Sequence, residues 1–179
     1  MLLPAGLGRN RSLNPAASLR IESVYASPVL FSGVAALALD NRELETIHIH
    51  LKEVLQNLQR LHKKTPECYV NFMAGNPGAT ALIHIRQMSL FGMVCRLHDS
   101  ILHRLASHLL LTEPDNSRSW FVSIRHLCAM YDLPSPLSLL SSPPTKDALK
   151  TLVKKKFIDH WQKKFRSDAE ELPSLNCFF

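Results

Sequence analysis

The chain has 179 residues and a formal net charge of +6 at neutral pH, with 46% hydrophobic and 20% charged residues. This length and composition are typical of a globular protein with a substantial apolar core, and they argue against disorder throughout. The cysteines at positions 68, 95, 128 and 177 are too widely spaced for a zinc ribbon or a secreted disulfide framework.

The early apolar segments predict neither secretion nor membrane insertion. Pro4, Gly6 and Gly8 interrupt the first residues before the apolar core of a signal peptide can form. The longest apolar run, residues 29–39, is interrupted by polar and glycine positions and falls short of the ~20 residues that span a bilayer. We therefore expect an intracellular protein, either nuclear or cytoplasmic.

The first part of the chain predicts two helical segments. Asn14 and Pro15 form an N-cap followed by an N1 proline, and the helix that they start is expected to kink or restart near Pro28. Asp40 and Glu43 form a capping-box pattern, after which apolar residues recur at steps of three and four. Those apolar residues are Leu44, Ile47, Leu51, Val54, Leu58 and Leu61.

Proline and glycine divide the middle of the chain into further helices. Pro66 opens a short helix that Gly75 ends, and Pro77 starts another, in which Gly92 predicts close packing against a neighbouring helix. Asp99 or Ser100 caps a segment that runs through residue 111.

A polar loop at residues 113–119 separates that segment from a helix that starts at Trp120. We therefore expect two helical subregions, residues 1–113 and residues 114–179.

A long basic helix is expected at about residues 146–171. Proline-rich stretches precede it, and Thr145 supplies its N-cap. Every fourth residue on one face is apolar, which predicts a buried stripe. Since no useful alternating strand pattern occurs, we expect an all-α fold, an irregular multi-helix bundle. The stripe consists of Leu149, Val153, Phe157, Trp161 and Phe165.

Residues 145–166 hold the whole excess of positive charge. They contain eight lysines and arginines against two aspartates, and the rest of the chain has 13 basic and 13 acidic residues. A solvated helix face is the more common meaning of such a run, but an anionic partner is the alternative that its isolation favours. The candidate contacts to a nucleic-acid backbone are Lys150, Lys154, Lys155, Lys156, Lys163, Lys164 and Arg166.

The sequence predicts no self-sufficient catalytic centre. Cys95 and His98 lie one helical turn apart, but their apolar surroundings favour a buried, reduced thiol. There is no histidine pair at i, i+4 spacing, no glycine-rich phosphate loop, and no adjacent pair of aspartates for two-metal polymerase chemistry. We therefore expect no enzyme activity, metal site, cofactor or small-molecule substrate.

Five runs of the sequence carry a resemblance when they are taken in order. They are SLRIESVYASPVL (residues 18–30), LQRLHKKTPEC (58–68), MAGNPGATALIHIRQMSLFGMVCRL (73–97), SRSWFVSIRHLCAMYDLPSPL (117–137) and KKKFIDHWQKKFRSDAEELPSL (154–175). Together they resemble the region that follows the polymerase core in reverse transcriptases of non-LTR (LINE-type) retrotransposons.

The resemblance covers nearly the whole chain and implies a non-catalytic C-terminal piece of an RNA-directed DNA polymerase, beginning near the thumb. Such a piece would pack on the missing polymerase core and contact RNA or DNA without reading its sequence. No catalytic residue is carried over, because the matching runs lie outside the catalytic motifs. Phe157 and Trp161 could stack on bases, although their i, i+4 spacing favours the core.

Two other interpretations remain open. In the first, the chain is a helical protein-interaction module, and residues 44–61 or the stripe at 149–165 pack on a partner helix. In the second, it is a decayed copy without function. Salt-sensitive binding to nucleic acid would favour the hypothesis of backbone contact, whereas salt-insensitive self-association would favour the interaction module.

Overall fold

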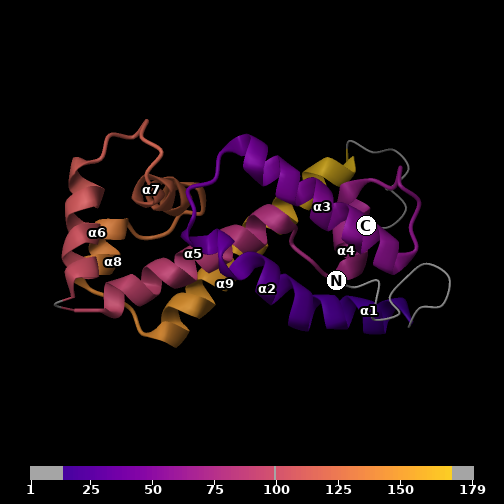
Figure 1. The fold of residues 1–179 in the computed structure, drawn as a ribbon, viewed down its shortest axis with the longest axis horizontal. Helices are drawn as coiled ribbons and strands as arrows, with labels where there is room; N and C mark the ends of the chain where they lie inside the picture. Colours follow the sequence, from indigo (N-terminus) through magenta and orange to yellow (C-terminus); the bar gives the residue numbers. More distant parts are fainter. Residues whose placement is uncertain (1–13, 99, 171–179) are drawn as a thin grey trace. The chain divides into compact units, whose positions relative to one another are not determined.

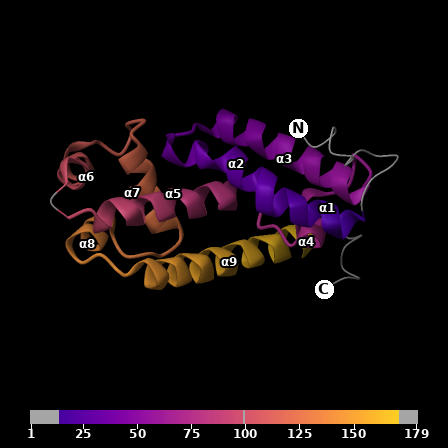
Figure 2. The same cartoon turned by 60° about the horizontal axis from the view of Figure 1, so that its bottom comes forward.

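The computed structural model describes residues 14–98 and 100–170, and these residues form helices joined by short loops (Figures 1 and 2). No strand occurs in this part of the chain, which confirms the predicted all-α, multi-helix fold. Asp99 and the side chains of Phe165 and residues 168–170 lie outside the description. The α-helices are α1 Pro15–Ile21, α2 Ser27–Ser32, α3 Asn41–Gln59, α4 Glu67–Ala74, α5 Ala79–Arg96, α6 Ile101–Thr112, α7 Trp120–Met130, α8 Pro136–Ser141 and α9 Lys146–Glu170.

The described residues gather into two compact units. Unit 1 contains the chain through Ser32, the segment Asp40–Leu82 and the end of α9 from Gln162. Unit 2 contains Gly33–Leu39 and Ile83–Trp161, so α5 and α9 each contribute residues to both units.

The loop near residue 114, where the sequence suggested a boundary between subregions, lies inside unit 2. Arg125 of α7 bridges this loop, because its guanidinium donates hydrogen bonds to the main-chain oxygens of Leu110 (3.2 Å) and Glu113 (2.6 Å). The polar segment at residues 113–119 is therefore a loop between α6 and α7 within unit 2.

In unit 1, α1 begins as predicted, and the α-helix is interrupted and restarts near Pro28, also as predicted. The Asn14 side chain accepts a hydrogen bond from the Ala16 amide at 3.0 Å, and Pro15 occupies the first turn. A π-helical turn, Glu22–Ala26, then leads into α2, which runs through Pro28. The wider turn moves the preceding carbonyls away from the proline ring, which would clash with them in a regular α-helix.

The π-helical turn also keeps one side of this segment buried. Ser18, Glu22, Ser27 and Phe31 are all buried, at successive steps of four, five and four residues. A step of five residues stays on one side of the helix only because the turn is wider than an α-helical turn. The Ser27 hydroxyl donates to the buried Glu22 carboxylate at 2.5 Å, so this carboxylate is partnered inside the unit.

Helices α3 and α4 lie side by side in unit 1 (Figure 1). The predicted capping box is present: the Asp40 amide donates to the Glu43 carboxylate at 2.7 Å, and the Glu43 amide donates to the Asp40 carboxylate at 2.8 Å. Gly75 ends α4 with a φ of 61°, the left-handed conformation that glycine adopts without steric cost. The apolar face of α3 is turned inward through its buried residues Leu51, Leu55 and Leu58.

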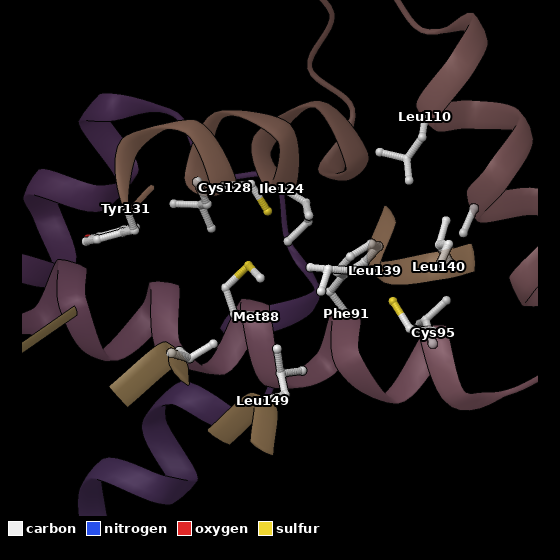
Figure 3. Close-up of a cluster of buried hydrophobic side chains, with 14 of the residues drawn as sticks. Met88, Phe91, Cys95, Leu110, Ile124, Cys128, Tyr131, Leu139, Leu140 and Leu149 are labelled. Atoms are coloured by element: carbon white, nitrogen blue, oxygen red, sulfur yellow. The ribbon is translucent and has the colours of Figure 1, made fainter. Parts of the chain in front are cut away.

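Unit 2 has a continuous apolar core supplied by helices α5 to α9 (Figure 3). Phe91, Ile124 and Phe157 are among its fully buried side chains. At Gly92 of α5, a Cβ atom would lie 2.0 Å from Cδ2 of Leu149 on α9, so any larger residue here would force the buried Leu149 side chain to shift. The prediction of close helix packing at Gly92 is thereby confirmed.

The short helix α8 was not predicted, since its prolines were interpreted as punctuation. Ser135 and Pro136 in fact start it: the Ser135 hydroxyl accepts from the Ser138 amide at 3.2 Å, and the proline occupies the first turn. Two of its leucines, Leu139 and Leu140, are buried in the unit 2 core.

Candidate nucleic-acid interface

Helix α9 is held in unit 2 by its apolar face. Thr145 caps its start, as predicted, with its hydroxyl accepting from the Ala148 amide at 3.3 Å. Leu149, Val153 and Phe157 are 4%, 3% and 1% exposed, which confirms the predicted stripe over these positions. Trp161 is half-buried against the same core, and the Phe165 side chain lies outside the described residues.

Tyr131, at the end of α7, fixes α9 more specifically than the stripe alone. Its ring stacks on Phe157, with centroids 3.6 Å apart and planes at 15°. Its hydroxyl accepts a hydrogen bond from the Trp161 indole nitrogen at 3.0 Å and is 2.8 Å from Nδ1 of His84 on α5. Sequence reasoning missed this contact, because the hydrogen-bonded partners are 30 and 47 residues from Tyr131 along the chain.

Tyr131 and its hydrogen-bond partner His84 are both neutral at pH 7. Burial, and to a smaller extent the electrostatic effect of His160, lowers the pKa of His84 to about 4. Burial likewise raises the pKa of Tyr131 to about 12, against the opposing effect of the Trp161 hydrogen bond. A neutral imidazole can accept at Nδ1, so the Tyr131 hydroxyl can accept from Trp161 and donate to His84. This chain of hydrogen bonds ties α9 and α5 to the end of α7.

The opposite face of α9 carries the candidate lysines of unit 2. Lys150, Lys154 and Lys155 are exposed, and none of them has a hydrogen bond or ion pair in the described part of the chain. They line a shallow hollow on the surface of α9 together with Asp147, Thr151, Ile158 and Asp159. The lysines outnumber the aspartates on this face, so the hollow is weakly positive.

Lys156 is turned away from this face. Its ammonium group lies 2.6 Å from the carboxylate of Asp132, just after α7, and this hydrogen bond lowers the pKa of that carboxyl. Consecutive helical residues point about 100° apart, so three adjacent lysines cannot share one direction. Of the run at 154–156, the structure presents Lys154 and Lys155 outward and uses Lys156 within unit 2.

The remaining candidates belong to unit 1. Lys163, Lys164 and Arg166 lie on α9 beyond Trp161, and all three are exposed. They are cationic side chains at the surface, as a backbone contact requires.

The aromatic candidates differ in accessibility. Phe157 is 1% exposed and stacked on Tyr131, so its faces are covered by protein. Trp161 is half-buried, and its indole nitrogen is used by Tyr131. Phe157 is therefore not an open platform for a base, because stacking needs a free face.

Cys95 and His98, the possible nucleophile pair, differ in exposure, because Cys95 is buried and His98 is at the surface. Cys95 is 1% exposed and burial raises the pKa of its thiol to about 11, so it is protonated at neutral pH. His98 is exposed, with its ring centroid 5.8 Å from that of His103. Within residues 14–98 and 100–170, no group of three or more His, Cys, Asp or Glu side chains is arranged to hold a metal ion.

No family model matches this chain, and no curated protein and no solved structure matches it either. Among the described helices, none is both long enough and apolar enough to cross a lipid bilayer.

Proposed function

We propose that this chain is a non-catalytic C-terminal segment of a non-LTR retrotransposon reverse transcriptase that contacts the nucleic-acid backbone through α9. One observation carries the proposal. The apolar face of α9 is buried, which leaves Lys150, Lys154 and Lys155 exposed on the opposite face, with no hydrogen bond or ion pair to another described residue. A row of exposed ammonium groups on a fixed helix binds phosphates without reading bases.

The five ordered sequence runs supply the family part of the proposal, and the exposed lysines supply the mode of contact. If the chain derives from such a reverse transcriptase, we also propose that it packs on the polymerase core of the parent protein and that it is nuclear or cytoplasmic. The chain has no adjacent aspartates, so we propose that any catalysis belongs to another part of the parent protein.

The test is the salt dependence of binding. We expect Lys154→Gln together with Lys155→Gln to weaken binding to unrelated labelled RNA and DNA strands alike. The slope of log affinity against log salt should fall by about 1.4 to 1.8, since each lost phosphate contact removes roughly 0.7 to 0.9. Fluorescence anisotropy over a salt series measures both quantities.

Two controls separate local contact from net charge. Lys63→Gln with Lys64→Gln removes the same charge from an exposed pair after α3 and should leave the slope unchanged. Lys156→Gln should have little effect, because Lys156 is paired with Asp132. An unchanged slope for the Lys154/Lys155 variant would reject the proposal. Equal decreases in slope for both lysine pairs would mean that binding depends on the net charge of the chain and not on contact at α9.

The burial of two apolar surfaces favours the nucleic-acid proposal over the interaction-module alternative. Leu51 and Leu58 of α3 and the α9 stripe through Phe157 are buried within their own units. A partner helix would have to displace these packed side chains, which makes them a less favourable docking surface.

A further inference from the structure

Helix α6 of unit 2 leaves an apolar stripe uncovered. Ile101 is 85% exposed, Leu102 54% and Leu105 45%, although their side chains are large and apolar. The opposite side of α6 is used for packing, because Ala106 and Leu110 are buried in the unit 2 core. The exposed stripe is therefore not an unfolded or frayed segment but the outer face of a packed helix.

The spacing of the stripe is that of a helix-packing face. Ile101, Leu105 and the half-buried Leu109 follow one another at steps of four residues, and Leu102 lies three residues before Leu105, which is the spacing by which one helix lies against another. A contiguous exposed apolar face on a globular unit commonly marks an interaction site.

One edge of this stripe is basic. Arg104 and His108 lie one turn apart beside it, both exposed. Residues 100–112 contain no aspartate or glutamate. A partner with carboxylates along the matching edge would be attracted, and one with lysines there would be repelled.

The same edge argues against a second copy of this chain as the partner. Two copies that paired antiparallel through the stripe would place Arg104 of one beside Arg104 of the other, and like charges at close range oppose pairing. We propose that α6 docks an amphipathic helix of another protein, with leucine-type anchors and an acidic edge. This proposal does not rest on the nucleic-acid role of α9.

The test uses two synthetic helical peptides and the whole chain. Both peptides carry leucines at i, i+3, i+4 and i+7 spacing; one has glutamates along an edge and the other has lysines at the same positions. By fluorescence anisotropy, the acidic peptide should bind at least about tenfold more tightly than the basic one. Equal affinity, or no binding of the acidic peptide, would overturn the proposal.

Variants locate the site. Ile101→Ser with Leu105→Ser should weaken the acidic peptide at least about tenfold. The matched control, Val24→Ser with Val29→Ser, changes two exposed residues of unit 1 and should have no effect. An equal loss in the control would show nonspecific hydrophobic binding and reject the proposal.

Charge reversal tests the acidic edge independently of folding. Arg104→Glu should weaken the acidic peptide and strengthen the basic one, whereas unchanged preferences would reject electrostatic selection. Analytical ultracentrifugation tests self-association. If the wild-type chain forms dimers and the Ile101/Leu105 variant does not, the α6 stripe binds a second copy of this chain, and the proposal of another protein is wrong.

Discussion

Tyr131 is the residue on which the position of α9 within unit 2 most depends. Phe157 could pack in several orientations as a hydrophobic side chain, but the Tyr131 ring stacks on it and the Tyr131 hydroxyl bonds Trp161. The hydrogen bonds to Trp161 and His84 make this hydroxyl costly to remove, because both partners would lose a bond at a site with little water.

We predict that Tyr131→Phe lowers the free energy of unfolding by about 1 to 3 kcal/mol, the usual cost of leaving buried polar groups unsatisfied. Chemical denaturation followed by circular dichroism measures it. Tyr25→Phe is the matched control, since Tyr25 is 69% exposed, and it should be neutral. Equal stabilities of the wild type and Tyr131→Phe would mean that the hydroxyl does not hold α9.

His84 makes the stability of unit 2 sensitive to mild acid. Its pKa is about 4 in the folded protein and 6.5 for an unperturbed histidine side chain, so between these values the unfolded state binds more protons. The free energy of unfolding should therefore fall as the pH is lowered from 6.5 to 4, by roughly 3 kcal/mol in total.

Comparison with His84→Gln isolates this contribution, because glutamine can hydrogen-bond but does not titrate. His48 acts with the opposite sign: its hydrogen bond to Glu67 raises its pKa, so its contribution is present at low pH and is lost as the pH rises. Over a denaturation series from about pH 4 to 7, the free energy of unfolding should depend less on pH for His84→Gln than for the wild type. Identical curves would mean that His84 is not the source of the pH dependence.

At the scale of helices, Gly92 sets how closely α5 and α9 pack in unit 2. Gly92→Ala should cost about 1 to 3 kcal/mol, because its methyl group would overlap the buried Leu149 side chain. Gly33→Ala is the matched control, since nothing lies within 4 Å of its added Cβ. In Gly92→Ala with Leu149→Ala, the two losses should be less than additive in a denaturant titration; full additivity would mean that the residues do not touch.

The sequence predicted best the elements whose signals are local. The Asp40 capping box, the Gly75 end of α4 and the Thr145 start of α9 are each specified by residues within a few positions. The interruption near Pro28 was predicted but its π-helical form was not, because proline indicates a break and a widened turn leaves no sequence pattern of its own.

The candidate site was predictable only in part. The buried stripe of α9 followed from the spacing of its apolar residues. Which lysine is paired depends on Asp132, 24 residues away. The contacts of Tyr131 and the exposed face of α6 depend on which helices pack together, and the local sequence pattern carries no information about that packing.

For the whole molecule, the decisive prediction concerns catalysis. We expect the purified chain to show no metal-dependent nucleotide incorporation on a primed RNA template, because it has no adjacent aspartates to hold two metal ions. An active reverse transcriptase on the same template serves as the positive control. Template-dependent extension that disappears on chelation and is traceable to this chain would overturn the proposed function.

The π-helical turn at Glu22–Ala26 has the geometry of one residue added to an otherwise regular helix. Deleting Val24, whose side chain is exposed, would change the buried steps from four, five and four residues to four throughout. That spacing is close to the repeat of an uninterrupted α-helix, but in such a helix the ring of Pro28 would clash with the carbonyl of the preceding turn. The extra residue therefore accommodates the proline, and a chain one residue shorter should keep its stability only when Pro28 is also replaced by alanine.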